Sequence, residues 1–377
     1  MTYSFFKGLA NPNRAFRFCG LLAVSSLLVF SSCDKNDDDN NPSTSDIKPK
    51  GAAPVWGPDI TPQMLTVVEK IEELSDTTPL HTLTVAQARV APSAADAALA
   101  VQADFKIPTP VSKSDTSGVE IPVSDGSSIH ARIFTPRTGK SSYPVIVYYH
   151  GGGFVIATVD TYKSSAQALA EKTDAIVVSV EYRKAPEFTF PTAHNDAYDA
   201  YTWVLHNGTT FKGDTAKVAL AGESAGGNLA AATSMKAAEM GIKRPLYQVL
   251  VYPVANNDTT TASATTYKDA IPLGRSELTW FYEKYTPVPS QGDDPRISLV
   301  DQAVLTNMPP TTIIAAELDP LQTEGKQLAD KLTAAGITVT YQLYKGVTHE
   351  FFGMNTVIPE ANQAEDLAAS KLKDALK

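Results

Sequence analysis

The chain has 377 residues, of which 41 are acidic and 32 basic, so its formal net charge is −9. This negative field repels polyanions, and basic residues do not cluster with aromatic ones, which excludes nucleic acid as an expected partner. The length suffices for one large α/β domain with an extensive core.

The N-terminal segment has the pattern of an export signal. Three basic residues precede an apolar run over 19–30, which is too short to span a bilayer as a helix. The small residues before Cys33 resemble a lipobox, with Phe30 in place of the usual leucine. We therefore expect a signal peptide over 1–32 and a lipidated Cys33, with a plain secretory signal or a retained anchor helix as alternatives. Removal of Cys19 with the signal leaves no disulfide, so the mature fold must rely on its core.

Residues 33–58 are rich in charge, proline and serine. Such a segment buries too little apolar surface to offset its loss of conformational entropy, so we expect a disordered acidic tether. An acidic run after a lipidated cysteine resembles the export signal of some Gram-negative surface lipoproteins. It predicts an exported protein at the bacterial outer membrane or cell surface, with membrane contact through the lipid anchor only. A solvated linker is the alternative interpretation.

The predicted folded domain spans 59–377 and begins with two helices. Thr61-Pro62 is typical of an N-cap and first helical position, and apolar residues over 64–74 form a one-sided stripe. Ser93 and Asp96 have the spacing of a capping box that opens a second helix. These helices precede the first strand, so we expect them to pack outside the sheet, either as a surface pair or as part of a lid.

A hairpin and six buried strands follow in the domain. Asp125-Gly126 favours a tight turn between strands over 118–123 and 128–135. Apolar runs then alternate with helical patterns, and these runs are 145–149, 175–181, 218–221, 247–252, 312–316 and 337–344. The pattern predicts an eight-stranded, mostly parallel α/β sheet with helices on both faces. Ligands of such sheets bind outside the carboxyl ends of the strands.

A glycine loop, His150-Gly151-Gly152-Gly153-Phe154, directly follows the first of these runs. Consecutive glycines can turn backbone N–H groups toward one point, and anions bind in such concavities. A phosphate loop is the competing interpretation, but the Lys and Ser/Thr of a P-loop and the glycine spacing of a dinucleotide-binding loop are missing. We therefore expect an oxyanion hole, with His150 orienting the loop rather than transferring protons.

A serine motif, Gly222-Glu223-Ser224-Ala225-Gly226, lies between an apolar run and an alanine-rich helical pattern. The motif alone also occurs in ordinary loops. In a sharp strand-to-helix turn, however, the serine hydroxyl points outward, and the flanking glycines let strand and helix approach closely. We expect Ser224 to be a nucleophile, with the N–H groups of Gly152, Gly153 and Ala225 around the negative oxygen that its attack creates.

Three motifs together resemble the hormone-sensitive-lipase-like family of α/β-hydrolases. They are His-Gly-Gly-Gly-Phe over 150–154, Tyr-Arg-Lys-Ala-Pro-Glu over 182–187 and Gly-Glu-Ser-Ala-Gly-Gly over 222–227. The resemblance implies an α/β-hydrolase fold with a small helical cap, serine esterase activity, and no metal or cofactor. In that family the Tyr-Arg block braces the loop behind the active site. Glu223 stands where that family usually has aspartate, and Thr323 departs from a position that is commonly acidic there.

A serine nucleophile needs a base and an acid further along the chain. The order in α/β-hydrolases is serine, acid, histidine, and of the six histidines only His349 follows Ser224. Glu317 and Asp319 both lie at the end of the preceding strand, and an aspartate before Pro320 is also typical of a helix N-cap. The family's Asp-Pro-Leu matches Asp319, so we expect Asp319 to be the acid.

These parts predict a serine carboxylesterase that hydrolyses small-molecule, short-acyl esters through an acyl-enzyme intermediate. A cap made from two short segments, about 59–105 and 256–296, leaves a limited pocket rather than the broad apolar surface of a fat-hydrolysing lipase. Aromatic residues of the second segment either line this pocket or pack on the sheet; they are Trp280, Phe281, Tyr282 and Tyr285. The alternatives are a peptidase or amidase on the same fold, or a binding-only protein. The sequence leaves the oligomeric state open.

Overall fold

A computed structural model describes residues 43–377. The predicted signal peptide, Cys33 and the first part of the tether lie outside the described residues. No helix within residues 43–377 is long and apolar enough to cross a membrane.

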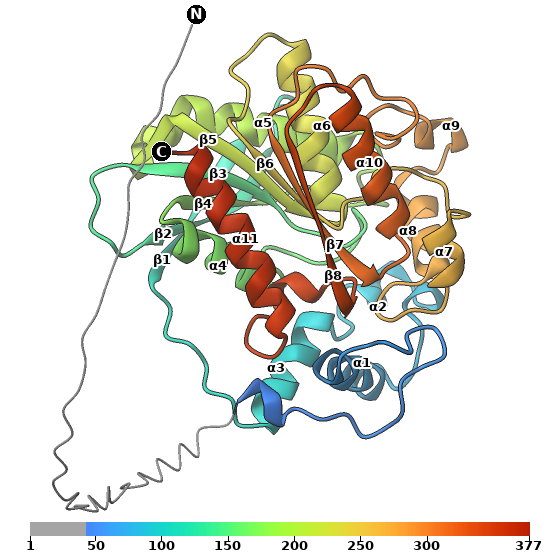
Figure 1. The fold of residues 1–377 in the computed structure, drawn as a ribbon. Coiled ribbons are helices and arrows are strands. Elements are labelled where there is room, and N and C mark those ends of the chain that lie inside the picture. Colours follow the sequence, from blue (N-terminus) through green and yellow to red (C-terminus); the bar gives the residue numbers. More distant parts are fainter. Residues whose placement is uncertain (1–42) are drawn as a thin grey trace, which may run out of the picture. The chain divides into compact units, whose positions relative to one another are not determined.

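The domain is built on one eight-stranded sheet (Figure 1). Its strands are β1 (Ser114–Pro122), β2 (Ser128–Pro136), β3 (Tyr143–Tyr149), β4 (Ile176–Glu181), β5 (Gly213–Glu223), β6 (Gln248–Val251), β7 (Thr311–Leu318) and β8 (Val339–Thr348). Their order is β1-β2-β4-β3-β5-β6-β7-β8. Pairs β1–β2 and β2–β4 are antiparallel, and the other pairs are parallel. The predicted fold class is therefore confirmed.

Several strand predictions differ from the structure at their ends, and β1 begins at Ser114 rather than at residue 118. β5 starts at Gly213 rather than at residue 218, because Gly213 pairs with Tyr143 ahead of a bulge in β3 and β5. β8 runs to Thr348, where it pairs with Leu318, although Lys345 and Gly346 interrupt the apolar pattern. This longer β8 brings the strand directly up to residue 349.

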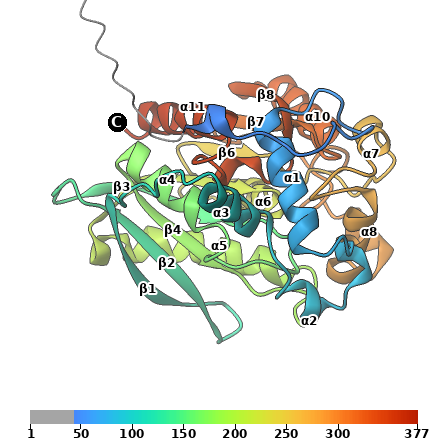
Figure 2. The ribbon, with the colours of Figure 1, turned by 90° about the horizontal axis from the view of Figure 1, so that it is seen from below.

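Helices cover both faces of the sheet and one of its ends. They are α1 (Pro62–Leu74), α2 (Val85–Ala88), α3 (Ala94–Asp104), α4 (Lys163–Thr173), α5 (Thr192–Asn207), α6 (Ala225–Glu239), α7 (Ala262–Thr266), α8 (Arg275–Tyr285), α9 (Pro289–Gly292), α10 (Gln322–Ala334) and α11 (Pro359–Ala375). The two predicted N-terminal helices are confirmed as α1 and α3, each with the predicted side-chain cap. Figure 2 looks at the end where α1, α2 and α3 lie.

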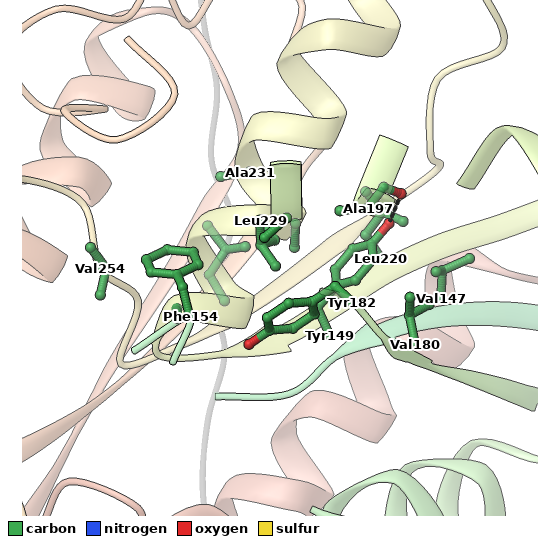
Figure 3. Packing of buried hydrophobic residues seen from close by; sticks show 14 of the residues in the cluster. Val147, Tyr149, Phe154, Val180, Tyr182, Ala197, Leu220, Leu229, Ala231 and Val254 are labelled. Carbon is green, nitrogen blue, oxygen red and sulfur yellow. Dashed lines mark hydrogen bonds between the residues drawn. The ribbon is translucent and has the colours of Figure 1, made fainter. Parts of the chain in front are cut away.

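The period-two alternation of the strands divides the core into two halves. In β3, Val145, Val147 and Tyr149 pack on the face covered by α5, α6 and α10, whereas Ile146 and Tyr148 pack on the face covered by α4 and α11. Figure 3 shows Tyr149 within the first half, where its hydroxyl donates a 2.8 Å hydrogen bond to the carbonyl of Ala197. The continuously apolar strands follow from burial on both faces.

The predicted tether is wrong over residues 43–58, where the structure shows packing against α1. Ile47 is only 1% exposed and belongs to the core half that contains α1. The backbone N–H groups of Lys50 and Gly51 donate to the Glu69 carboxylate at 2.8 and 2.6 Å. One isoleucine and one carboxylate thus hold a segment whose composition by itself indicates disorder.

Candidate active site

Ser224 lies in the turn between β5 and α6, in a strained backbone conformation with φ 55° and ψ −119°. The two motif glycines are required by close packing rather than by their own dihedral angles. A Cβ on Gly222 would lie 2.1 Å from the carbonyl oxygen of Gly226, and one on Gly226 would lie 2.0 Å from that of Tyr149. The turn therefore presses α6 against the end of β3, next to the glycine loop.

Ser224, His349 and Asp319 form one hydrogen-bonded chain, although they come from three separate strand ends. His349 Nε2 lies 2.9 Å from Ser224 Oγ, and its Nδ1 lies 2.7 Å from Asp319 Oδ2. The second carboxylate oxygen of Asp319 accepts from the N–H of Leu321 at 2.8 Å. Asp319 thus orients the imidazole with one oxygen and closes a turn to Leu321 with the other. The N-cap of α10 is Leu321, so the capping role that the Asp-Pro pattern indicates for Asp319 is wrong.

Glu317, the rival acid, is held elsewhere. Its carboxylate pairs with Lys345 Nζ at 2.5 Å and accepts from the N–H of Gly346 at 2.8 Å. Both partners belong to β8 before it reaches His349. The structure therefore gives Glu317 a role in fastening β8 and leaves Asp319 as the acid that contacts the imidazole.

The charge of His349 is set by two opposing effects. Burial lowers the pKa of the imidazole, but Asp319 in first place, with Glu350 and Glu223, raises it, so that the pKa of His349 is raised overall. The Tyr252 ring lies 4.4 Å from the imidazole, centroid to centroid. Nothing in the sequence pattern singled out Tyr252, since its position depends on how β6 lies beside β7.

A buried carboxyl group, Glu223, lies directly behind the serine. It accepts hydrogen bonds from the hydroxyls of Tyr148 and Tyr252 and is 1% exposed. Burial raises the pKa of Glu223 to about 7. Where the resembling family usually has aspartate, this chain therefore has a longer acid, which reaches a tyrosine of β3 and another directly after β6.

The glycine loop has the geometry of an anion site. Gly152 and Gly153 have φ values of 99° and 58°, a backbone region that side chains rarely adopt. Among residues 43–377, neither N–H donates to a protein acceptor. Ala225 is the first residue of α6, so its N–H has no intrahelical acceptor. All three predicted donors thus retain a free hydrogen-bonding capacity.

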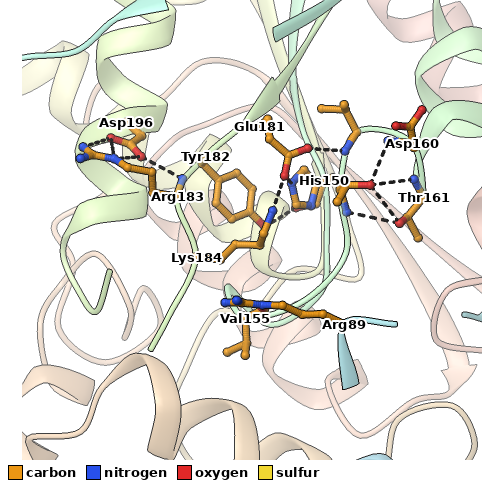
Figure 4. Close-up of polar contacts among 12 residues, drawn as sticks. Arg89, His150, Val155, Asp160, Thr161, Glu181, Tyr182, Arg183, Lys184 and Asp196 are labelled. Atoms are coloured by element: carbon orange, nitrogen blue, oxygen red, sulfur yellow. Dashed lines mark hydrogen bonds and ion pairs between the residues drawn. The ribbon is translucent and has the colours of Figure 1, made fainter. Parts of the chain in front are cut away.

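His150 is buried away from solvent at the start of this loop (Figure 4). Its Nδ1 donates to the carbonyl of Gly151 at 2.7 Å, and its ring stacks on Tyr182 at 4.3 Å. Burial lowers the pKa of His150 to about 4, so the ring is neutral at pH 7. These contacts fit the prediction that His150 orients the loop.

One cavity of about 880 Å³ opens onto Ser224, His349, Gly152 and Gly153. Both predicted cap parts contribute to its walls, through residues within 71–96 and 268–282. A hydrogen bond of 2.5 Å between His81 and Glu277 joins these two parts beside the cavity. The lid interpretation of the N-terminal helices is thus favoured over a surface pair.

The four aromatic residues of the second cap part divide between the two interpretations. Phe281 and Tyr282 line the cavity, and a Cβ on Gly153 would meet the Phe281 ring at 2.2 Å. Tyr285 instead packs inside the domain, stacked on Phe154 at 4.1 Å, and Trp280 is also buried. The helical spacing of α8 explains the split, because one face meets the cavity and another the core.

Thr323, the other departure from the family pattern, exchanges hydrogen bonds with Ser263. The Thr323 N–H donates to Ser263 Oγ at 2.9 Å, and Thr323 Oγ1 accepts from the Ser263 N–H at 3.0 Å. The next residue, Glu324, accepts from the N–H groups of Ala255 and Asn256.

No group of three or more His, Cys, Asp or Glu side chains that could hold a metal ion occurs within 43–377.

Comparison with known proteins places ester hydrolases among the relatives of this chain. A family model described as an alpha/beta hydrolase fold matches residues 146–353. An ethyl acetate hydrolase of Pseudomonas putida is 31% identical over 83% of this chain and 97% of its own length, and the carboxylesterase NlhH of Mycobacterium tuberculosis is 36% identical over 66% and 79%.

Solved structures show the same relationship. A hyperthermophilic esterase from Pyrobaculum calidifontis is similar with a TM-score of 0.75 and 33% identity, over 84% of this chain and 98% of that one. A thermostable esterase from Pseudomonas putida has a TM-score of 0.77 and 30% identity, over 85% and 98%. The chain therefore belongs to the hormone-sensitive-lipase-like family of α/β-hydrolases and is a carboxylic ester hydrolase.

Proposed function

We propose that this esterase uses Ser224 as nucleophile, His349 as general base and Asp319 as the acid that orients the base. The observation that carries this assignment is the imidazole of His349, which bridges Ser224 Oγ at 2.9 Å and Asp319 Oδ2 at 2.7 Å beneath the cavity. The first distance allows proton transfer between Ser224 and His349, and the second allows Asp319 to orient the imidazole.

The reaction follows from this geometry. His349 Nε2 takes the hydroxyl proton as Ser224 Oγ attacks the ester carbonyl, and the N–H groups of Gly152, Gly153 and Ala225 stabilise the negative oxygen. The imidazolium then donates its proton to the leaving alcohol, which gives an acyl-enzyme. Water, activated by the same base, attacks the acyl group, and Ser224 regains its proton.

Substitution of the nucleophile and the base tests the assignment. We expect Ser224→Ala and His349→Ala each to reduce the hydrolysis of an aryl acetate by several orders of magnitude while leaving the thermal transition in place. Turnover near that of the wild type in either variant refutes the mechanism. A chain that cleaves amides but not esters would favour the peptidase alternative, and one that binds esters without turnover the binding-only alternative.

The cavity also supports a preference for short acyl groups. Its walls come from both cap parts, and Phe281 packs directly against the glycine loop, so substrates enter a bounded pocket and not an open apolar surface. A panel of aryl esters from two to about sixteen acyl carbons tests this preference. Activity that rises toward the longest, water-insoluble esters contradicts it.

For localisation we propose that lipid on Cys33 anchors the enzyme at a bacterial outer membrane or cell surface, which rests on the lipobox resemblance and the acidic run after it. Two or three acyl chains anchor a protein stably, whereas one binds reversibly. We expect Cys33→Ser to release the protein from the membrane fraction or to leave it unprocessed. Native soluble protein that retains Met1 contradicts this proposal.

A further inference from the structure

The glycine loop is strained beyond its glycines. Phe154 and Ala157 also have positive φ values, 63° and 65°, in a region that non-glycine residues seldom occupy. Such conformations persist only where the surrounding structure holds them. The contacts that fasten this loop therefore decide where the N–H groups of Gly152 and Gly153 point.

The sheet side of the loop is fastened by the block over 182–187. The Tyr182 hydroxyl donates to the carbonyls of His150 and Gly151 at 2.9 and 3.2 Å, and the N–H of Ala185 donates to the carbonyl of Phe154 at 2.9 Å. These contacts reach the loop as far as Phe154. None of these three hydrogen bonds involves the carbonyl of Val155, the next residue.

Arg89 supplies that contact from the cap side. It follows α2, and its Nε donates to the carbonyl of Val155 at 2.9 Å (Figure 4). Its Nη2 donates to the carbonyl of Ala185 at 2.8 Å, and the guanidinium forms a two-armed pair with Glu187 at 2.9 and 2.6 Å. One side chain of the first cap part thus ties the glycine loop to the block that braces it.

We propose that Arg89 is a positioning residue for ester hydrolysis, which couples the seating of the cap to the orientation of the N–H groups of Gly152 and Gly153. The inference rests on the proposed function of that loop as an oxyanion hole. The planar guanidinium is required because it donates to two carbonyls and a carboxylate at once, which an ammonium group on a flexible stem cannot do with the same geometry.

The chain contains a matched control for this arginine. Arg137 also pairs with a carboxylate, Asp115, and donates to two backbone carbonyls, those of Ser112 and Ser114 at 3.0 Å each. It directly follows β2 and does not line the cavity. Arg137→Ala therefore removes contacts to the same kinds of acceptor, two carbonyls and one carboxylate, without touching the glycine loop.

The experiment compares Arg89→Ala, Arg89→Lys, Glu187→Gln and Arg137→Ala in the full chain. We expect Arg89→Ala to lower kcat for an aryl acetate roughly ten- to a hundredfold, because a small displacement of catalytic groups has effects of this size. Arg89→Lys should recover part of the loss. Glu187→Gln keeps both carbonyl contacts of Arg89 and removes only the charge of its carboxylate partner, so it should lower kcat less than Arg89→Ala does. The kcat of Arg137→Ala should stay near the wild-type value.

Inhibitor binding separates positioning from a merely structural role. An alkyl boronic acid forms a tetrahedral adduct with a negative oxygen, whereas an N-alkyl acetamide of similar size mimics only the ground state. Loss of positioning weakens boronate binding by about the same factor as kcat and changes amide binding little. If Arg89→Ala does not fold, the ratio of boronate to amide affinity is measured in Arg89→Lys instead.

Two results overturn the inference and one distinguishes it from the proposed function. Unchanged kcat in Arg89→Ala excludes positioning, and so does a loss of kcat with an unchanged boronate-to-amide affinity ratio. If these occur while Ser224→Ala is inactive, Arg89 is structural and the proposed function stands. Wild-type turnover in Ser224→Ala would refute both together.

Discussion

The contact between Gly226 and the end of β3 makes a quantitative prediction about the active site. A Cβ at residue 226 would lie 2.0 Å from the carbonyl oxygen of Tyr149 and 2.5 Å from that of His150, whereas real Cβ contacts essentially never fall under 3.0 Å. Both partners are backbone atoms, so α6 and β3 must separate by about 1 Å. Because His150 begins the glycine loop, this shift moves Ser224 and Ala225 away from the N–H groups of Gly152 and Gly153.

A misplacement of this size typically reduces catalysis about a hundredfold, and overpacking destabilises a fold by roughly 1–3 kcal/mol. We therefore expect Gly226→Ala to lower kcat/KM for an aryl acetate about a hundredfold and to lower Tm without abolishing folding. Gly325→Ala is the matched control, because it lies within α10 and its Cβ would meet its nearest neighbour at 4.0 Å. The control should keep its activity. If Gly226→Ala retains kcat/KM within about threefold of the wild type, close packing does not position Ser224.

Two further predictions concern protonation. Asp319→Asn should lower kcat by three to four orders of magnitude, about the effect of losing the orienting acid in a triad, and the acid limb of the kcat/KM profile should move to lower pH, because the carboxylate raises the pKa of His349. Burial raises the pKa of Glu223 from 4.5 to about 7. The free energy of unfolding should therefore fall as the pH rises between these two values, because the unfolded chain releases a proton that the folded chain keeps. Glu223→Gln should not show this decrease, so its free energy of unfolding in urea should gain up to about 3 kcal/mol relative to the wild type as the pH rises. A difference between variant and wild type that stays constant with pH would contradict this prediction.

The parts of the site that could be predicted from the sequence are those encoded within one local segment. Three glycines, a serine between glycines and a lone downstream histidine each follow a strand end, and parallel strands bring such ends to one edge of a sheet. The choice between Glu317 and Asp319 needed the family resemblance. In the structure the carboxylate of Glu317 forms an ion pair with Lys345 on β8, and this contact between two strands is not visible in the local pattern around Asp319.

The parts that could not be predicted depend on contacts between distant segments. Arg89 and Val155 are 66 positions apart, and Tyr148 lies 75 positions before Glu223. Composition also misled the prediction over residues 43–58, because the burial of Ile47 depends on α1 and not on its own polar neighbours. Local patterns thus locate the reacting groups, while the residues that orient them emerge only from the packed structure.

The acidic groups around His349 show why such orienting contacts matter for chemistry. Asp319, Glu223 and Glu350 all act to raise the pKa of the imidazole, and a base whose pKa is raised too far would stay protonated and inactive. Burial raises the pKa of Glu223 to about 7 and also raises the pKa of Glu350, whereas the tyrosine hydroxyls that donate to each carboxyl oppose part of this shift. Burial therefore weakens the negative charge that Glu223 places near the imidazole at neutral pH. Asp319 is the acid among these three that hydrogen-bonds to His349, and this contact orients the imidazole and stabilises its charged form.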